Sequence, residues 1–328
     1  MKKKGLVERI VMKEPSKEGF SQHRLPNDRK QLLSYMLKNK FSKIYKNHLL
    51  MALFFIPLVV WGILTMSYSD MLFSLDPREG IILLPEYWVT VYVTAIPLWM
   101  LAFVGISGGL NVLRKLAWSD PVILMHDFVH GIKASGKQMV FVGFLWASAY
   151  ALIRYAIDWL GFYYRVFDDS ASIVFGIFVC LFVMLVAVGM TVYMACMSSM
   201  YNVNAKELLV GAFKLYFADF LPATGVIILS LLPVVIFLSL DYAITTLIAY
   251  ILTLATFIGI LVIPMMLMCQ HSFDRIINKK DYPDYYGKGL SYGTYSSPDI
   301  VDDVENSLEI DEKNKVTDDF ERVTDDEN

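Results

Sequence analysis

Charged residues are scarce in this chain of 328 residues. They make up 19% of it, against about 25% in an average soluble domain, whereas hydrophobic residues reach 56%. The mean hydropathy is +0.48. This composition excludes a disordered chain, a collagen-like chain and a nucleic-acid binder with a broad basic surface. It favours a chain whose middle part lies in lipid.

Cysteines and catalytic motifs are also scarce or missing. The three cysteines, Cys180, Cys196 and Cys269, have no spacing typical of a disulfide framework or a zinc site. No phosphate-binding loop, dinucleotide fingerprint or nucleophile elbow is visible. The sequence therefore predicts a protein that is not an enzyme, has no cofactor and has no nucleic-acid partner.

Long apolar runs dominate the middle of the chain. A helix needs about 20 apolar residues to cross a bilayer core of about 30 Å. Because the runs are continuously apolar, they exclude the alternating strands of a membrane β-barrel. The sequence predicts an all-α polytopic membrane protein with a transmembrane domain at 48–270. Its six transmembrane helices lie near Leu49–Ser67, Trp88–Leu110, Met139–Tyr163, Ser172–Ser198, Leu221–Leu240 and Ile244–Met268.

The distribution of lysine and arginine predicts the orientation. Short cytoplasmic loops carry an excess of both residues. Residues 1–47 hold 13 Lys/Arg against 4 acidic residues, whereas the loops on the opposite side hold only Arg78 and Arg165. We therefore expect a multi-pass protein of the cell membrane with both termini in the cytoplasm.

Three cytoplasmic segments flank the predicted transmembrane domain. The basic head at 1–47 contains an amphipathic helix at 29–47, which we expect to lie on the inner leaflet through Leu33, Leu37, Phe41 and Ile44. A juxtamembrane segment follows at 271–298. The tail at 299–328 holds 13 acidic and 3 basic residues, a composition that predicts disorder.

Two inner loops each predict a further interfacial helix. The first, at 120–137, begins with Ser119-Asp120-Pro121, a capping residue followed by proline. The second, at 204–217, begins at Asn204, with Glu207 three residues later as in a capping box. Its apolar face consists of Leu208, Ala212, Leu215 and Tyr216.

One pattern suggests a metal site. His126-Asp127-x-x-His130 has two histidines four residues apart on a helix, which can bind one zinc ion beside a carboxylate base. Aspartate is a methylene shorter than the usual glutamate, and no third ligand follows at a recognisable spacing. The helix also has the pattern of an interfacial helix with His126 near its edge, so a surface helix that carries two histidines is the favoured interpretation.

A second pattern lies inside a predicted span. Arg154 and Asp158 are four residues apart, so their side chains share one helix face. Charges within a span are costly and usually paired. The two residues fit either a structural ion pair near the outer surface or the polar site of a transporter.

Gly105 and Gly109 form a G-x-x-x-G pattern, which allows close helix contact within the bundle or between protomers. The surrounding sequence resembles the YesL-like family of bacterial integral membrane proteins. The resemblance rests on 105–115, Asp127-Phe128, Gly131, Lys133 and Lys137-Gln138. It departs from the family at Ser135, where the usual residue is asparagine, and at Gly136, where it is aromatic.

The resemblance implies a protein of Gram-positive bacteria with no established activity, associated with carbohydrate uptake and sensing. Our first hypothesis is an accessory or modulator of a membrane transport or sensing complex. Its partners would be transporter or sensor subunits and the lipid bilayer, and its contact residues Arg114, Asp127, Lys133 and Lys137. Alternatives are a secondary transporter with a site at Arg154 and Asp158, and a membrane zinc peptidase that uses His126 and His130.

Overall fold

A computed structural model describes residues 25–75, 77–167, 170–238 and 258–291. This part of the chain is all-helical and contains no strand. Five of its helices are long and apolar enough to cross a membrane: Phe41–Thr65, Tyr87–Ala117, Leu124–Gly161, Ala171–Met200 and Gly259–Asp281. A bent helix pair, Ala205–Ala218 with Phe220–Leu232, brings the number to six if it counts as one span. The prediction of an all-α chain is confirmed for the described residues, and the five or six long apolar helices are consistent with a multi-pass membrane protein.

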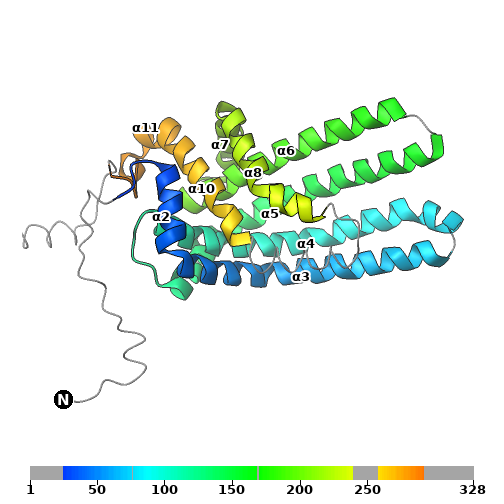
Figure 1. Ribbon diagram of the computed structural model, residues 1–328, viewed down its shortest axis with the longest axis horizontal. Helices are drawn as coiled ribbons and strands as arrows, with labels where there is room; N and C mark the ends of the chain where they lie inside the picture. Colours follow the sequence, from blue (N-terminus) through cyan, green and yellow to red (C-terminus); the bar gives the residue numbers. More distant parts are fainter. Residues whose placement is uncertain (1–24, 76, 168–169, 239–257, 292–328) are drawn as a thin grey trace, which may run out of the picture.

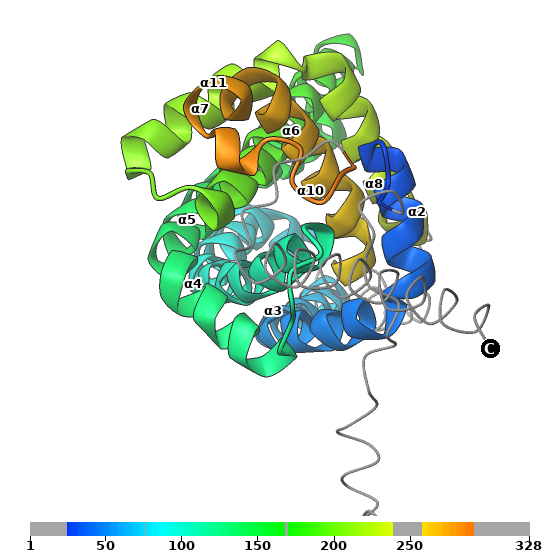
Figure 2. The ribbon, with the colours of Figure 1, turned by 90° about the vertical axis from the view of Figure 1, so that its left-hand side faces the viewer.

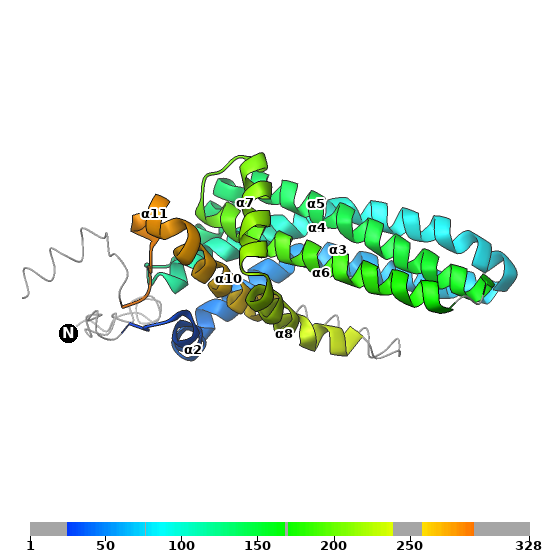
Figure 3. The same cartoon turned by 90° about the horizontal axis from the view of Figure 1, so that it is seen from above.

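Four long helices form the body of the molecule. They are α3 (Phe41–Leu75), α4 (Pro77–Ala117), α5 (Leu124–Phe167) and α6 (Ser170–Met200). They run side by side as two helical hairpins (Figures 1 and 3). We call the end where α3 and α5 finish the hairpin end, and the opposite end, where α4 and α6 finish, the cap end.

Shorter helices cover the cap end. They are α2 (Arg29–Asn39), the π-helix η3 (Asp274–Asn278), α11 (Lys279–Asp281) and the 3₁₀-helix η4 (Pro283–Tyr285). In Figure 2, α2 and α11 lie in front of the ends of the long helices. Beside the body lie α7 (Ala205–Ala218), α8 (Phe220–Leu238) and α10 (Ile258–Phe273). Both ends of the described chain therefore meet at the cap end.

Glycines of α4 allow α3 to approach closely. A Cβ atom on Gly105 would lie 2.6 Å from the Cβ of Phe54, and one on Gly109 would lie 2.2 Å from the sulfur of Met51. Asn47 of α3 donates to the carbonyl of Gly109 at 3.2 Å. The G-x-x-x-G pattern thus serves packing inside one chain.

The same region of α4 also receives α5. A Cβ on Gly131 of α5 would lie 2.5 Å from the Cβ of Asn111 and 3.0 Å from the carbonyl oxygen of Ser107. A Cβ on Gly108 would lie 2.9 Å from the carbonyl oxygen of Phe128. These contacts leave no room for a side chain at either glycine.

The expected separate helix at 120–137 is part of one continuous helix. α5 starts at Leu124, later than the Ser119-Asp120-Pro121 signal predicts, and runs through residue 137 into the span without a break. Ser119 adopts a left-handed backbone with φ of 61° and lies in the turn that ends α4, where its N–H donates to the carbonyl of Leu116 at 3.3 Å. The carboxylate of Asp127 then accepts the backbone N–H of Ile123 at 2.8 Å and secures the first turn.

The expected amphipathic helix at 29–47 is divided at Lys40. Its first part, α2, buries Leu32 and Met36 completely against the bundle and exposes no large apolar side chain. α2 therefore packs on protein rather than on lipid. The exposed apolar residues, Phe41, Tyr45 and Leu49, belong to α3.

The predicted helix at 204–217 is confirmed: it is α7, and it begins with the predicted capping contact. The backbone N–H of Asn204 donates to the carboxylate of Glu207 at 3.0 Å. The four residues of the predicted apolar face, Leu208, Ala212, Leu215 and Tyr216, are the buried residues of α7. Three predicted features lie outside the described residues: the first part of the head (1–24), the acidic tail (299–328) and much of the sixth span (244–257).

Gly131 provides a test of the close α4–α5 contact. We expect Gly131→Ala to lower the free energy of unfolding by about 1–3 kcal/mol, because the added methyl meets the α4 backbone. Gly161→Ala on the same helix is the matched control, since a Cβ there meets nothing within 4 Å. It should leave stability unchanged or raise it by up to about 1 kcal/mol. Thermal unfolding in detergent measures both, and equal effects would refute the packing argument.

Candidate functional site

Asp127 joins the end of α4 to the start of α5. Its side chain is only 4% exposed, and one carboxylate oxygen binds the ammonium of Lys115 at 2.8 Å. The other oxygen accepts the backbone N–H of Ile123 at 2.8 Å. Both oxygens are therefore engaged within the chain, and Asp127 faces the interior.

Arg114 also binds its own chain. Its guanidinium donates to the side-chain oxygen of Asn111 at 2.7 Å and to the carbonyl of Ser199 at the end of α6. Asn111 in turn donates to the backbone carbonyl of Asp127 at 2.7 Å. The guanidinium also lies over the ring of Trp118, 5.1 Å from its centroid. Of the four predicted contact residues, Arg114 and Asp127 thus tie α4, α5 and α6 together.

The other two predicted contact residues point outward. Lys133 and Lys137 are exposed on the first turns of α5, in line with His126 and His130. Beside them, Met125 is 62% exposed and Val129 is 38% exposed. A shallow hollow of about 330 Å³ lies among five of these side chains. We call this surface the α5 face: Met125, His126, Val129, His130, Lys133 and Lys137.

The two histidines of the predicted zinc site do lie close together. Their rings stack with centroids 6.3 Å apart. The carboxylate between them in sequence, Asp127, is held by Lys115 and lies 3.5 Å from the nearest nitrogen of His126. Within the described ranges, no group of three His, Cys, Asp or Glu residues could hold a metal ion. The arrangement offers two ligands and no free carboxylate base.

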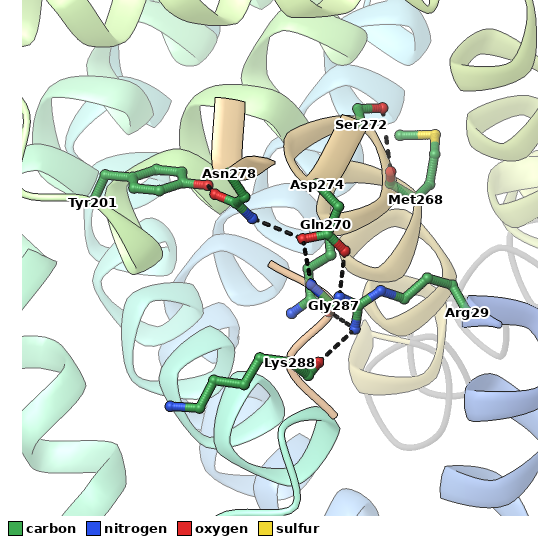
Figure 4. A network of polar contacts seen from close by, with 9 residues as sticks. All are labelled: Arg29, Tyr201, Met268, Gln270, Ser272, Asp274, Asn278, Gly287 and Lys288. Carbon is green, nitrogen blue, oxygen red and sulfur yellow. Dashed lines mark hydrogen bonds and ion pairs between the residues drawn. The ribbon is translucent and has the colours of Figure 1, made fainter. Parts of the chain in front are cut away.

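A second polar network joins the two ends of the chain. The guanidinium of Arg29 in α2 binds the carboxylate of Asp274 at 2.6 Å (Figure 4), and both side chains are at least nine-tenths buried. Arg29 also donates to the side-chain oxygen of Gln270 at 3.0 Å and to the carbonyl of Lys288 at 3.1 Å. We call this network, with the contacts of Asp274 that follow, the clasp.

The second oxygen of Asp274 organises the segment after η3. It accepts the side-chain amide of Asn278 at 2.8 Å and the backbone N–H of Gly287 at 3.3 Å (Figure 4). Gly287 has φ of 63°, a backbone conformation that favours glycine. The phenol of Tyr201 donates to Asn278 at 2.5 Å. Burial, followed by the nearby charge of Asp274, raises the pKa of Tyr201, which keeps this phenol a donor.

Arg154 and Asp158 lie together as their spacing predicts. An Arg154 nitrogen is 3.5 Å from an oxygen of Asp158, and their side chains are 39% and 26% exposed. The hydroxyl of Tyr92 in α4 donates to Asp158. Rings continue from there along the α4–α5 contact: Tyr92 meets Tyr150 at 6.2 Å and Tyr150 meets Trp99 at 5.8 Å. Asp158 thus has partners on α4 and α5, whereas Nε of Arg154 is buried without a hydrogen-bond partner, and the pair is still partly accessible.

No family model, curated protein or solved structure matches this chain. The resemblance to the YesL-like family therefore stands on the sequence pattern. The structure gives much of that pattern a packing role: Gly105 and Gly109 against α3, Gly108 against Phe128, and Gly131 against α4. Gln138, the last residue of the pattern, donates to the carbonyl of Val203 before α7 at 2.7 Å.

The clasp predicts a large loss of stability when one partner is removed. Arg29→Ala leaves the Asp274 carboxylate buried and unpaired, which costs about 3–5 kcal/mol. We expect a lower unfolding temperature and faster amide exchange at Gly287. Lys30→Ala, at the neighbouring exposed position, is the control. The double variant Arg29→Met/Asp274→Leu should be closer to wild type than Arg29→Ala, and a worse double variant would contradict this account.

Lys40 predicts a pH dependence of stability. Its ammonium donates to the carbonyl of Leu116 at 2.8 Å and to the hydroxyl of Ser119 at 3.3 Å. Burial lowers the pKa of Lys40 from 10.5 to about 8. The unfolded chain thus binds this proton more tightly, so the free energy of unfolding should rise between pH 8 and 10.5.

We expect Lys40→Met to flatten that rise, whereas Lys46→Met, at an exposed position in α3, should retain it. Denaturant titrations at several pH values measure the slope. An unchanged slope in Lys40→Met would assign the pH dependence to other groups.

Proposed function

We propose that the chain is a non-enzymatic protein of the cell membrane that assists or modulates a transport or sensing complex. In this proposal the cap end and both termini lie in the cytoplasm, and the α5 face binds a subunit of that complex. The resemblance to the YesL-like family supports a link to carbohydrate uptake or sensing.

The basic residues support the orientation. Among the described residues at the hairpin end, the basic residues are Arg78 at the start of α4 and Arg165 near the end of α5. The cap end carries many more, and cytoplasmic segments carry such an excess. They include Arg29, Lys30, Lys38, Lys40, Arg114, Lys115, Lys133, Lys137, Arg275, Lys279 and Lys280.

The position of α7 supports the proposal that the inner surface of the membrane lies at the height of this helix. α7 is bent by 95° from α8, so it lies across the direction of a membrane-crossing α8. One face of α7 is buried in the protein. Apolar residues on its other sides are exposed, which suits an interfacial helix in contact with lipid. They are Leu209, Val210, Phe213 and Phe217.

The length of α5 is the observation that carries the proposal. Its 44 residues span about 66 Å at 1.5 Å per residue, roughly twice the bilayer core of about 30 Å. Gln138 contacts Val203 just before α7, so the turns before residue 138 extend from the level of α7 toward the cap end. There Met125 and Val129 are exposed beside Lys133 and Lys137, and we take this exposed stripe as the contact surface for a partner.

The charges of the α5 face define the partner. Lys133 and Lys137 add two positive charges beside the apolar side chains, while the nearest carboxylate, Asp127, is neutralised by Lys115. A complementary surface is acidic with an apolar centre. The partner we propose is a transporter or sensor subunit with such a surface.

Site-specific crosslinking tests this interface. A photoreactive residue at Val129 should attach to a transport or sensing subunit, and Lys133→Glu/Lys137→Glu should reduce that adduct at least tenfold. The matched control is Lys206→Glu/Lys214→Glu, which changes two exposed lysines of α7 and should leave the adduct intact. Recovery of no subunit, together with autonomous solute flux in liposomes, would reject the proposal.

Secondary transport is the second candidate. The observation in its favour is the partly accessible Arg154–Asp158 pair with its Tyr92 contact, because polar groups of this kind within spans often mark solute or proton pathways. Neutralising both charges with Arg154→Gln/Asp158→Asn should then abolish uptake in liposomes. If the variant retained uptake, the Arg154–Asp158 pair would have a structural role and the transporter candidate would be rejected. The zinc peptidase alternative has no geometric support beyond the two histidines.

A further inference from the structure

An apolar cavity lies between the body of the bundle and the two helices beside it. Its volume is about 190 Å³. Trp99 and Phe103 of α4 and Trp146 of α5 form part of its wall, Leu231 comes from α8, and Val262 from α10. These positions all fall in helices that can cross a membrane or in the α8 part of the bent pair.

The lining surface of the cavity is almost entirely apolar. Apart from Thr191 and Cys196, every residue around the cavity has a hydrocarbon, thioether or indole side chain. The hydroxyl of Thr191 donates to the carbonyl of Ala187 in its own helix at 2.7 Å. Water requires two to four polar partners to occupy a cavity. Water is therefore a poor occupant, and so is a polar solute.

The size of the cavity is suited to a hydrocarbon. An engineered protein cavity of about 150 Å³ lined by Leu, Ile and Phe stays free of water and binds benzene. An unfilled cavity of this size deprives its lining of van der Waals contacts. Around membrane-crossing helices, the abundant hydrocarbon is the acyl chain of a bilayer lipid.

We infer that this cavity is a binding site for one acyl chain of a membrane phospholipid. The chain lies against Trp99 and Trp146 and fills the space toward Leu231 and Val262. The site is separate from the α5 face and from the Arg154–Asp158 pair. It therefore does not rest on the function proposed above.

Fluorescence quenching by brominated lipid tests the site. The full chain is reconstituted in phosphatidylcholine vesicles with bromine on the acyl chains, and in matched vesicles without bromine. The contribution of Trp99 is obtained by subtracting the signal of Trp99→Phe. Bromine quenches indoles that it contacts, so we expect strong quenching of Trp99 in the wild-type protein.

Filling the cavity should remove that quenching. Ala195 lines the cavity and is 6% exposed, so Ala195→Leu adds a methine carbon and two methyl groups to the space and should reduce Trp99 quenching at least twofold. Val188→Leu, at a second lining position, is an independent filling variant in case the first fails to fold. Val183→Leu is the control on the same helix, since Val183 is 46% exposed and lies outside the lining.

Two results would overturn the inference. Absence of Trp99 quenching in the wild-type protein would mean that the cavity is empty or is filled by the chain itself. Quenching that persists in both filling variants would mean that lipid reaches Trp99 from the outer surface of the bundle.

Discussion

The close approach of α4 to its neighbours is the contact on which the rest of the structure depends. Helices in lipid gain little from the hydrophobic effect when they associate, so their packing relies on van der Waals contact and hydrogen bonds. Three glycines of α4 supply the contact with α3 on one side and α5 on the other. Asn47 adds a hydrogen bond to the buried carbonyl of Gly109.

The cap end is held by polar groups rather than by apolar packing alone. Arg114 and Asp127 join α4, α5 and α6, and the clasp between Arg29 and Asp274 holds α2 against the end of α10. Buried charges of this kind are costly unless each one is paired and hydrogen-bonded. Here the carboxylates of Asp127 and Asp274 each receive at least two donors. This makes the cap end a specific arrangement that joins both ends of the described chain.

Local patterns predicted much of the structure. The apolar runs, the Asn204–Glu207 contact and the Arg154–Asp158 pair are recognisable because their partners lie three or four residues apart or within one run. The docking of α2 was not predictable in the same way. Arg29 and Asp274 are separated by 245 positions, and no local period links them. The amphipathic pattern at 29–47 was assigned to lipid because the sequence does not distinguish a lipid surface from a protein surface.

The first turns of α5 show why sequence alone does not separate packed residues from surface residues. Asp127, Gly131 and Ser135 recur every four residues and are buried, and the first two contact α4. His126 and His130, each one position earlier, lie about 100° around the helix and are exposed. A short motif on this helix therefore contains both buried residues, which pack inside the protein, and exposed residues, which lie on its surface. Asp127 belongs to the buried set, whereas Lys133 and Lys137 belong to the exposed set. A partner that binds α5 would therefore contact the α5 face.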